Sequence, residues 1–237
     1  MKGMPEGKTI AVIGDSRGLG AAIRTQLLEQ GHRVIGVSRS GVSAAISNYQ
    51  SLVFDAVAHP CDLSGFADQL DGLVYCPGTI RLKPFKGLKR EHFLEELEIN
   101  ALGAVQTLQA NLKLLQQAPS ASVVLFSTVA VQSGMPYHAS IAMAKGAVEG
   151  LTRTLAAEWS PQIRVNAIAP SLTDTSLAEP MLSNEAKRTA AAERHPLQRV
   201  GTAEGVGSLA TWLLGDSSAF VTGQVYAADG GMGSIRK

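Results

Sequence analysis

Cysteine, aromatic side chains and net charge are all scarce in this sequence of 237 residues. There are two cysteines, 5% aromatic residues, and 21 basic against 20 acidic side chains, which gives a net charge of +1. Cys61 and Cys76 are too few for a disulfide framework or a CxxC metal site, so we expect a soluble protein of the reducing cytoplasm. The balanced charge argues against a protein that binds nucleic acid through its phosphates.

Long apolar runs and metal-ligand patterns are also missing. No stretch approaches about 18 uninterrupted apolar residues, so we expect no membrane-spanning helix. Residues 1–8 are polar and predict neither a signal peptide nor a transit segment. The five histidines show no metal-ligand spacing, and we therefore expect no metal site.

The sequence does contain short apolar runs that alternate with longer helical patterns, which is typical of βαβ units around a parallel sheet. Strands are predicted at 9–13, 33–37, 52–60, 72–76, 122–127, 164–169 and 224–227, and helices at 18–30, 90–117, 140–159 and 203–214. A further helix is expected within 39–50 and a truncated one within 63–71. We predict one doubly wound α/β domain over 1–237, with an insert at about 176–195 that covers the substrate.

A glycine-rich loop joins the first predicted strand to the first predicted helix. Its glycines allow the backbone to approach a pyrophosphate, and the helix N-terminus supplies free N–H groups and a partial positive charge. An ordinary glycine-rich turn is the alternative, but the position of this loop in a parallel α/β chain favours a phosphate site. The contacts expected here are Gly14, Ser16, Arg17, Gly18, Leu19 and Gly20.

The GxxxGxG spacing of this loop resembles the short-chain dehydrogenase/reductase family. The resemblance extends over almost the whole chain, to the segments Thr222-Gly223-Gln224 and Asp229-Gly230-Gly231. It implies a Rossmann-type fold, a nicotinamide dinucleotide and oxidoreductase activity on a small-molecule substrate. It also implies a homo-oligomer, a dimer or a homotetramer, formed through the helices expected at 90–117 and 140–159.

The same resemblance assigns cofactor contacts to further positions. Asp62 and Leu63 resemble the family segment that faces the adenine, and Cys76-Pro77-Gly78 stands where the family has the end of its Asn-Asn-Ala-Gly strand. The strand that ends at Pro170 resembles the one that reaches the nicotinamide. The remaining contacts that the resemblance implies are Asn100, Lys145, Thr173 and Thr175.

The charge near the second strand indicates which nicotinamide cofactor is bound. Members of the family that prefer NAD end this strand with an acid, which binds the ribose hydroxyls. Ser38 stands at that place, Arg39 follows it, and Arg17 lies in the glycine loop. Two guanidinium groups near the adenosine ribose would neutralise a 2′-phosphate, so we expect NADP(H) rather than NAD(H). The alternative is that both arginines are solvated surface residues.

The catalytic positions depart from the family pattern, which is Tyr-x-x-x-Lys with a Ser thirteen residues before the Tyr. Lys145 matches the Lys, but Ile141 stands in place of the Tyr and Thr128 in place of the Ser. Asn100 matches the helix Asn of the catalytic group. Thr128 can still polarise a carbonyl, whereas Ile141 has no proton to give, and loss of a general acid typically costs about 10²–10⁴ in rate.

Two nearby residues are alternative proton donors. If the helix starts early, with Pro136 at its first position, Tyr137 shares a helical stripe with Ile141 and Lys145. Helical side chains lean toward the N-terminus, however, so its phenol would point away from Lys145. His138 lies seven residues before Lys145, a spacing that resembles the Tyr of the enoyl-reductase branch, and histidine as a residue type can give or take a proton near neutral pH. For both residues, loop or interface packing is the simpler interpretation.

Two functions from different classes therefore stay open. One is an NADP(H)-dependent oxidoreductase that acts on a small carbonyl or alcohol, which the presence of Lys145 and Asn100 favours. The other is a catalytically degenerate dinucleotide-binding sensor or scaffold protein, which Ile141 favours.

Overall fold

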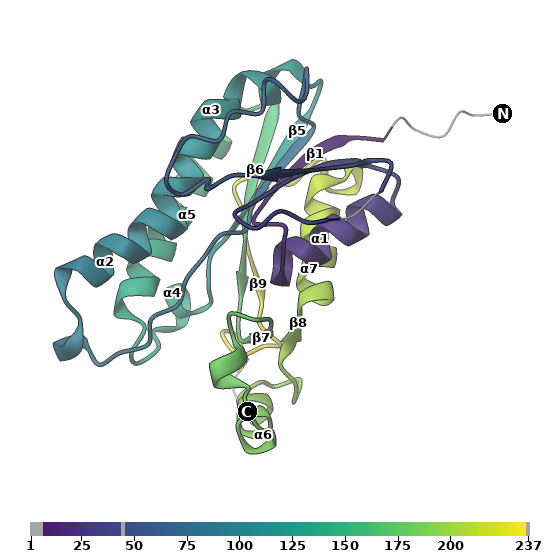
Figure 1. The fold of residues 1–237 in the computed structure, drawn as a ribbon. Helices are drawn as coiled ribbons and strands as arrows, with labels where there is room; N and C mark the ends of the chain where they lie inside the picture. Colours follow the sequence, from purple (N-terminus) through teal and green to yellow (C-terminus); the bar gives the residue numbers. More distant parts are fainter. Residues whose placement is uncertain (1–6, 44–45, 236–237) are drawn as a thin grey trace.

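The computed structural model describes residues 7–43 and 46–235, and Figure 1 shows how their helices and strands are arranged. The prediction of a chain start without a signal or transit segment falls mainly on residues 1–6, which lie outside the described residues. None of the helices in the described ranges combines the length and the apolar character that crossing a bilayer requires.

Seven strands of the described chain form one parallel sheet, in the order β3-β2-β1-β4-β5-β6-β9. They are β1 (Thr9–Ile13), β2 (Arg33–Ser38), β3 (Tyr49–Val53), β4 (Gly72–Tyr75), β5 (Ala121–Phe126), β6 (Ile163–Pro170) and β9 (Val225–Ala228). Strands β2 and β3 extend the sheet on one side of β1, and β4 begins its growth on the other side. This order confirms the predicted doubly wound α/β fold. In such a fold the crevice at the carboxyl ends of the strands, where the order reverses, is the expected ligand site.

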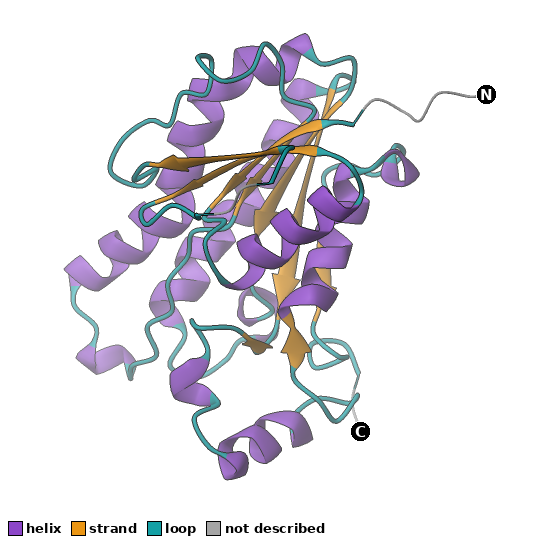
Figure 2. Cartoon of the chain, turned by 45° about the vertical axis from the view of Figure 1, so that its right-hand side comes forward, coloured by secondary structure: helices purple, strands orange, loops and turns teal. Residues whose placement is uncertain are grey.

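Helices cover both faces of the sheet, as Figure 2 shows. They are α1 (Gly18–Glu29) and α7 (Ala203–Leu214) on one face, and α3 (Gly103–Gln117) and α5 (Ala139–Trp159) on the other. Alternate residues of β1 enter two separate cores, because successive side chains of a strand point to opposite faces. Ile10 and Val12 pack with residues of α1 and α7, and Ala11 and Ile13 pack with residues of α3 and α5.

The predicted strands and helices are confirmed to within one residue at each end, except in three regions: the segment after β2, the connection before β4 and the helix predicted at 90–117. In the segment after β2, the described residues of 39–50 contain no helix. The extended run predicted at 52–60 is instead the strand β3 at Tyr49–Val53. None of the residues of β3 is fully buried, so no continuous apolar run marked its bounds.

The connection from β3 to β4 contains no helix, so the truncated helix predicted within 63–71 is wrong. Side chains of α3 satisfy the backbone of this connection instead. Buried Asn111 accepts a hydrogen bond from the Leu63 N–H (3.0 Å) and donates one to the Cys61 carbonyl (2.6 Å). Gln106 donates to the carbonyl oxygens of Ala56 (2.9 Å) and Val57 (2.7 Å).

The helix predicted at 90–117 is interrupted by a π-helical turn. It consists of α2 (Arg90–Leu97), the turn η2 (Glu98–Leu102) and α3. The Tyr75 hydroxyl donates to the Ile99 carbonyl at 2.9 Å, and Gly103 leaves the room that this hydroxyl needs. A side chain that inserts into the hydrogen-bond ladder of a helix is a common cause of such a turn. The turn contains Asn100, and π-helical turns are frequent at functional sites.

The predicted insert at 176–195 contains helical structure that its polar composition did not reveal. Its elements and their neighbours are β7 (Thr173–Asp174), η3 (Glu179–Met181), α6 (Glu185–Glu193) and β8 (Gly201–Thr202). In Figure 2 this segment lies beyond the arrowheads of the central strands, at the carboxyl edge of the sheet. A short helix not predicted from the sequence, α4 (Ala130–Ser133), follows β5 at the same edge.

Replacement of Asn111 should destabilise the protein, because Asn111 supports the helix-free crossover. In Asn111→Leu the Leu63 N–H and the Cys61 carbonyl lose their buried partner. A buried polar group left without a partner costs about 1–3 kcal/mol, so we expect the unfolding free energy to fall by about 2–4 kcal/mol in urea titrations. Gln109→Leu, an exposed position of the same helix, is the control and should change it by less than about 0.5 kcal/mol. Equal effects of the two substitutions would contradict this account of the crossover.

Candidate functional site

The glycine loop stands at the reversal point of the sheet, between β1 and α1. The Gly14 N–H donates to the Val37 carbonyl at 2.7 Å, which fixes the loop against the end of β2. Gly14 and Gly18 have φ of +82° and +57°, a region that favours glycine. The side chain of Arg17, the N-cap of α1, makes no capping bond, and the unpaired N–H groups of a first helical turn suit an anion. The loop therefore has the geometry of a phosphate cradle.

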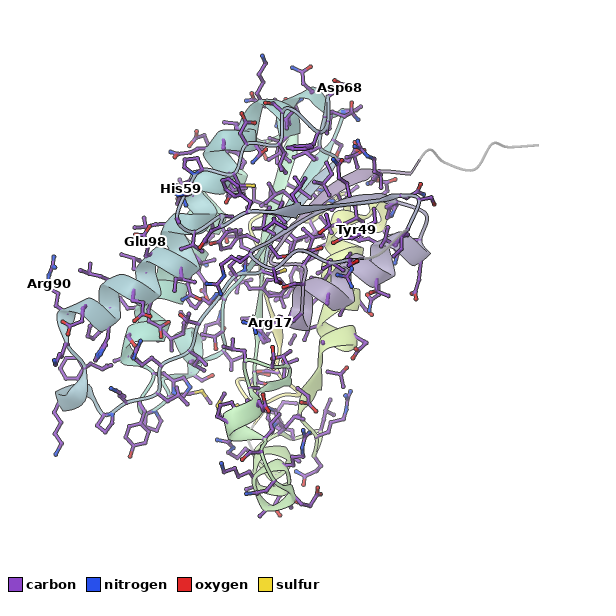
Figure 3. All side chains as sticks on the ribbon, in the orientation of Figure 1. Arg17, Tyr49, His59, Asp68, Arg90 and Glu98 are labelled. Atoms are coloured by element: carbon purple, nitrogen blue, oxygen red, sulfur yellow. The ribbon has the colours of Figure 1, made fainter. Side chains whose placement is uncertain are left out.

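Arg17 is exposed beside this loop. Figure 3 shows it at the end of α1 that is nearest to the segment carrying β7. The position that a Cβ on Gly18 would take lies 3.5 Å from the Cβ of Thr175. Thr175 therefore covers the start of α1 from the side of the insert. Ser16 and Leu19 are half-buried, and Gly20 is packed against the Gly14 carbonyl.

Asp15, an acid inside the glycine loop, is fully buried beneath it. The Tyr49 hydroxyl donates to Asp15 Oδ2, and Arg24 Nη1 lies 3.8 Å from the same oxygen. Arg24 also donates to the Asp15 carbonyl (2.9 Å), and its guanidinium lies 5.5 Å from the centre of the Tyr49 ring, which Figure 3 labels. Oδ2 of the carboxylate thus has its partners on the inner side of the loop, whereas Oδ1 is buried without a hydrogen-bond partner among the described residues.

The end of β2 borders the same loop. Ser38 is buried, and its Oγ has no hydrogen-bond partner among the described residues. Arg39 follows it and is exposed, one residue beyond the strand that holds Gly14. An orphaned hydroxyl and a guanidinium beside a phosphate cradle are the groups that a phosphorylated ribose would satisfy. The residues present therefore fit an adenine dinucleotide.

The other predicted adenine and strand-end contacts lie along the same edge of the sheet. Asp62 is exposed and accepts a hydrogen bond from the Ser64 N–H (2.8 Å), whereas Leu63 is buried. The Cys76 N–H donates to the Ile13 carbonyl (2.9 Å), so the β1–β4 pairing continues to the start of Cys76-Pro77-Gly78. Burial raises the pKa of the Cys76 thiol far above its usual range.

Lys145, on α5, is buried near Asn100 and Gly78. The position that a Cβ on Gly78 would take lies 3.1 Å from Asn100 Oδ1 and 3.7 Å from Lys145 Nζ. Burial lowers the pKa of Lys145 to about 8, and the negative charge of Glu96 opposes this shift. The site thus holds an ammonium whose proton is unusually easy to remove.

Thr128 and Ile141 complete the predicted catalytic positions. Thr128 lies just beyond β5 and is half-buried, with its Oγ1 3.4 Å from the Ala130 N–H. Ile141 lies one helical turn before Lys145 and is only 3% exposed. The hydroxyl of Thr128 and the ammonium of Lys145 are therefore the polar groups that these positions contribute.

Tyr137 and His138 lie before α5, outside the helix. Tyr137 is 58% exposed, and its backbone has a φ of +69°. The early helix start at Pro136, which would have placed Tyr137 on one helical stripe with Lys145, does not occur, because α5 begins only at Ala139. His138 is the N-cap of α5, and its Nδ1 lies 2.7 Å from the Pro136 carbonyl.

The predicted nicotinamide segment closes the site from the side of the insert. The Val129 N–H donates to the Pro170 carbonyl (3.2 Å), which ties the end of β6 to the segment after β5. Thr173 lies in the two-residue strand β7 and is buried. The structure thus brings the ends of β1, β2, β4, β5 and β6 to one edge, with the predicted contacts along it.

Comparison with known proteins identifies the family. A family model described as enoyl-(acyl carrier protein) reductase matches residues 13–233. A tropinone reductase homologue from Arabidopsis thaliana is 33% identical over 246 residues, which covers 95% of this chain and 92% of the relative. The chain belongs to the short-chain dehydrogenase/reductase family. This is a family of oxidoreductases, and the resemblance noted in the sequence is confirmed at that level.

Solved structures of the short-chain dehydrogenase/reductase family have the same fold. Ligand-free aldohexose dehydrogenase from Thermoplasma acidophilum matches with a TM-score of 0.87 and 24% identity, over 98% of this chain and 96% of that one. A protein from Agrobacterium tumefaciens, solved with bound NADP, matches with a TM-score of 0.85 and 29% identity, over 96% and 97%.

Two features of this region were not identified from the sequence. One is the pair formed by buried Asp15 and half-buried Tyr49, which are 34 residues apart. The other is Glu96 on α2, which is 1% exposed and lies four residues before Asn100. The i, i+4 spacing of Glu96 and Asn100 was a usable signal, because residues four apart share a helix face.

Removal of the Lys145 ammonium should make the protein more stable at neutral pH. The pKa of Lys145 is about 8 in the folded protein, against about 10.4 in an unfolded chain. Below pH 8 Lys145 is charged in both states, so folding loses stability because it buries this charge. Between pH 8 and about 10.4 the folded protein releases the proton while the unfolded chain keeps it, so the loss of stability shrinks as the pH rises. We expect Lys145→Met to be more stable by about 1–3 kcal/mol at pH 7, and this gain to vanish near pH 10.4.

Urea titrations at several pH values measure this difference. Lys113→Met, at an exposed position of α3, is the control and should show no comparable change with pH. A stability difference between wild type and Lys145→Met that stays constant from pH 7 to about 10.4 would contradict the buried ammonium.

Proposed function

We propose that the protein is an NADP(H)-dependent oxidoreductase of the short-chain type that acts on a small carbonyl or alcohol. The observation that carries this proposal is the buried ammonium of Lys145, near Asn100 and Gly78 at the edge of the sheet that holds the glycine loop. A buried ammonium is costly, so its place at the expected ligand crevice favours a chemical role. The family, whose named relatives include reductases and dehydrogenases, supports the reaction class.

Each residue has a definite part in this proposal. The loop Gly14-Asp15-Ser16-Arg17-Gly18-Leu19-Gly20 would hold the pyrophosphate, and Pro170, Thr173 and Thr175 would border the nicotinamide. The bound dinucleotide would supply or accept the hydride. Lys145 would bind the ribose and hold a proton near the substrate oxygen, and Thr128 would orient the carbonyl. Asn100 would support a relay of protons to solvent.

The preference for NADP(H) rests on charge around the ribose site. Arg17 and Arg39 are both exposed beside the loop, Ser38 has an unpartnered hydroxyl, and the acid of the loop, Asp15, contacts Tyr49 and Arg24 below it. A 2′-phosphate would meet two guanidinium groups there. The NADP bound to the protein from Agrobacterium tumefaciens is consistent with this preference.

We expect NADPH to bind more tightly than NADH, and Arg39→Asp to reverse the order. A carboxylate at 39 would repel the 2′-phosphate and accept hydrogen bonds from a ribose hydroxyl. Titration calorimetry of wild type and Arg39→Asp with both dinucleotides measures the effect. Arg90→Asp, an exposed position on α2, is a charge-matched control and should leave the order unchanged. Equal affinities, or a preference of wild type for NADH, would refute the assignment.

A second function is a dinucleotide-binding sensor or scaffold protein without turnover. Ile141, which is buried and has no exchangeable proton, favours it. The two functions differ in whether the cleft can protonate a reduced substrate, so restoring a hydroxyl at position 141 separates them.

We expect Ile141→Tyr to raise NADPH-dependent reduction of activated dicarbonyl compounds by about tenfold or more, within the range that a general acid supplies. Ile141→Phe adds similar bulk without a hydroxyl and is the matched control. Because Tyr137 and His138 lie outside α5, Tyr137→Phe and His138→Ala should change the steady-state rate little. If wild type and all four variants bind NADPH and none turns over, the sensor function is correct.

We also propose that the protein is a cytoplasmic homodimer or homotetramer assembled through α2 with α3 and through α5. Exposed apolar side chains support the proposal, among them Leu94 on α2, Leu102 on the turn η2 that joins α2 to α3, and Met143 on α5. The free thiols of Cys61 and Cys76 fit a reducing compartment.

A further inference from the structure

Glu96 is a buried acid beside the proposed catalytic lysine. It projects from α2, one turn before Asn100, and is 1% exposed. Its Oε2 accepts hydrogen bonds from Thr79 Oγ1 (2.9 Å) and from Asn100 Nδ2 (3.2 Å). A buried carboxyl is expensive, because its charged form loses the hydration that it has in water.

No basic group forms a direct ion pair with Glu96 among the described residues. The adjacent Glu95 takes the nearby guanidinium, with Arg81 Nη2 at 2.5 Å from its Oε2. The second oxygen of Glu96, Oε1, is buried and has no hydrogen-bond partner in the described chain. The local structure of α2 therefore accounts for one oxygen of this carboxyl and leaves the other without a partner.

Asn100 connects Glu96 to Lys145. Its Nδ2 faces Glu96, and its Oδ1 and Lys145 Nζ lie within 4 Å of one point in front of Gly78. Glu96 and Lys145 thus stand on two sides of one amide, without direct contact. Opposite charges in a poorly hydrated site still interact at such distances, because little water screens them.

The charges around both groups support this pairing. Burial raises the pKa of Glu96, whereas its hydrogen bond to Thr79 and the charges of Arg81 and Lys145 lower it and Glu95 raises it. For Lys145, Glu96 is the largest opposing charge, ahead of Cys76. Glu96 is therefore the main counter-charge of Lys145, whereas the desolvation of Glu96 is offset first by Thr79 and Arg81 and only then by Lys145.

We propose that Glu96 is a positioning residue that acts through Lys145, by keeping the buried ammonium charged until a substrate takes its proton. The proposal rests on the proposed function for the part that Lys145 plays. When the substrate oxygen takes the proton, an N–H bond breaks and an O–H bond forms. The neutral amine then regains a proton from solvent, and the Glu96 carboxylate favours this uptake. In this cleft Ile141 has no proton to give, and in the proposal Lys145 donates the proton instead.

The test is the titration of Lys145 itself. Protein labelled with ¹³C-lysine is followed by NMR at the lysine Cε over a range of pH, and the Lys145 signal is assigned by its absence in Lys145→Met. We expect a midpoint near 8 in wild type, and a midpoint lower by about one pH unit in Glu96→Gln, which keeps the shape of the side chain and removes its charge.

Three further variants separate a charge effect from a structural one. Glu95→Gln removes the neighbouring exposed acid and should leave the midpoint unchanged. Thr79→Val breaks a hydrogen bond of Glu96 but keeps its charge, so the midpoint should stay close to that of wild type. Glu96→Asp retains the charge and should restore most of the shift. If Glu96→Gln does not fold, a midpoint in Glu96→Asp that equals wild type, beside a lowered one in Glu96→Ala, supports the proposal.

An unchanged Lys145 midpoint in Glu96→Gln would overturn the proposal, as would equal shifts in Glu95→Gln and Glu96→Gln. The pH profile of kcat/KM is the second readout, and its alkaline limb should move to lower pH in Glu96→Gln alone. If wild type shows no turnover, the proposed oxidoreductase function fails, and the NMR midpoint still decides whether Glu96 holds the charge of Lys145.

Discussion

Parallel pairing that is covered on both faces is the constraint on which the rest of this structure depends. All six residues of β5 are buried, and β1, β2 and β6 are buried over most of their length. Such strands have no face on which a polar group can meet solvent. Polar side chains that must reach a ligand or solvent therefore stand at the carboxyl ends of the strands and on the helix faces beside them, where the proposed site lies.

The elements that the sequence predicts well are those whose burial leaves a simple pattern. Strands such as β5 are continuous apolar runs, and α7 carries the threonine cap and the apolar stripe of a helix against a sheet. The connection before β4 was mispredicted because the expectation of a crossover helix came from the general rule for βαβ units. The chain uses Asn111 instead, 48 residues from the Leu63 N–H that it satisfies, and no local pattern shows such a partner.

The site could be predicted in its positions but only partly in its chemistry. The glycine loop, Asn100 and Lys145 lie where their motifs predict, because motif spacing encodes backbone geometry. Glu96 lies in an acidic stretch of α2, and a charge there is most simply interpreted as part of a solvated face. Its burial depends on Thr79 and on the loop after β4, so only the packed structure reveals it.

Asp15 illustrates the same point in the opposite direction. An acid in a phosphate loop suggests repulsion of the ligand, yet Tyr49 and Arg24 hold it on the inner side. The loop is thereby joined to β3 at the edge of the sheet. One buried carboxylate thus ties the glycine loop to a strand that begins 34 residues further along the chain.

The π-helical turn has a consequence for how this chain can vary. A π-helical turn takes one residue more than a regular turn over nearly the same rotation, so α2 and α3 keep the angular phase of one continuous helix. In this turn the Gly103 N–H bonds to the Glu98 carbonyl, which leaves the Ile99 carbonyl to accept the Tyr75 hydroxyl. Deleting one residue within Glu98–Leu102 would give a regular helix in which the backbone ladder takes up that carbonyl. The end of β4 would then lose its polar tie to the segment that carries Asn100.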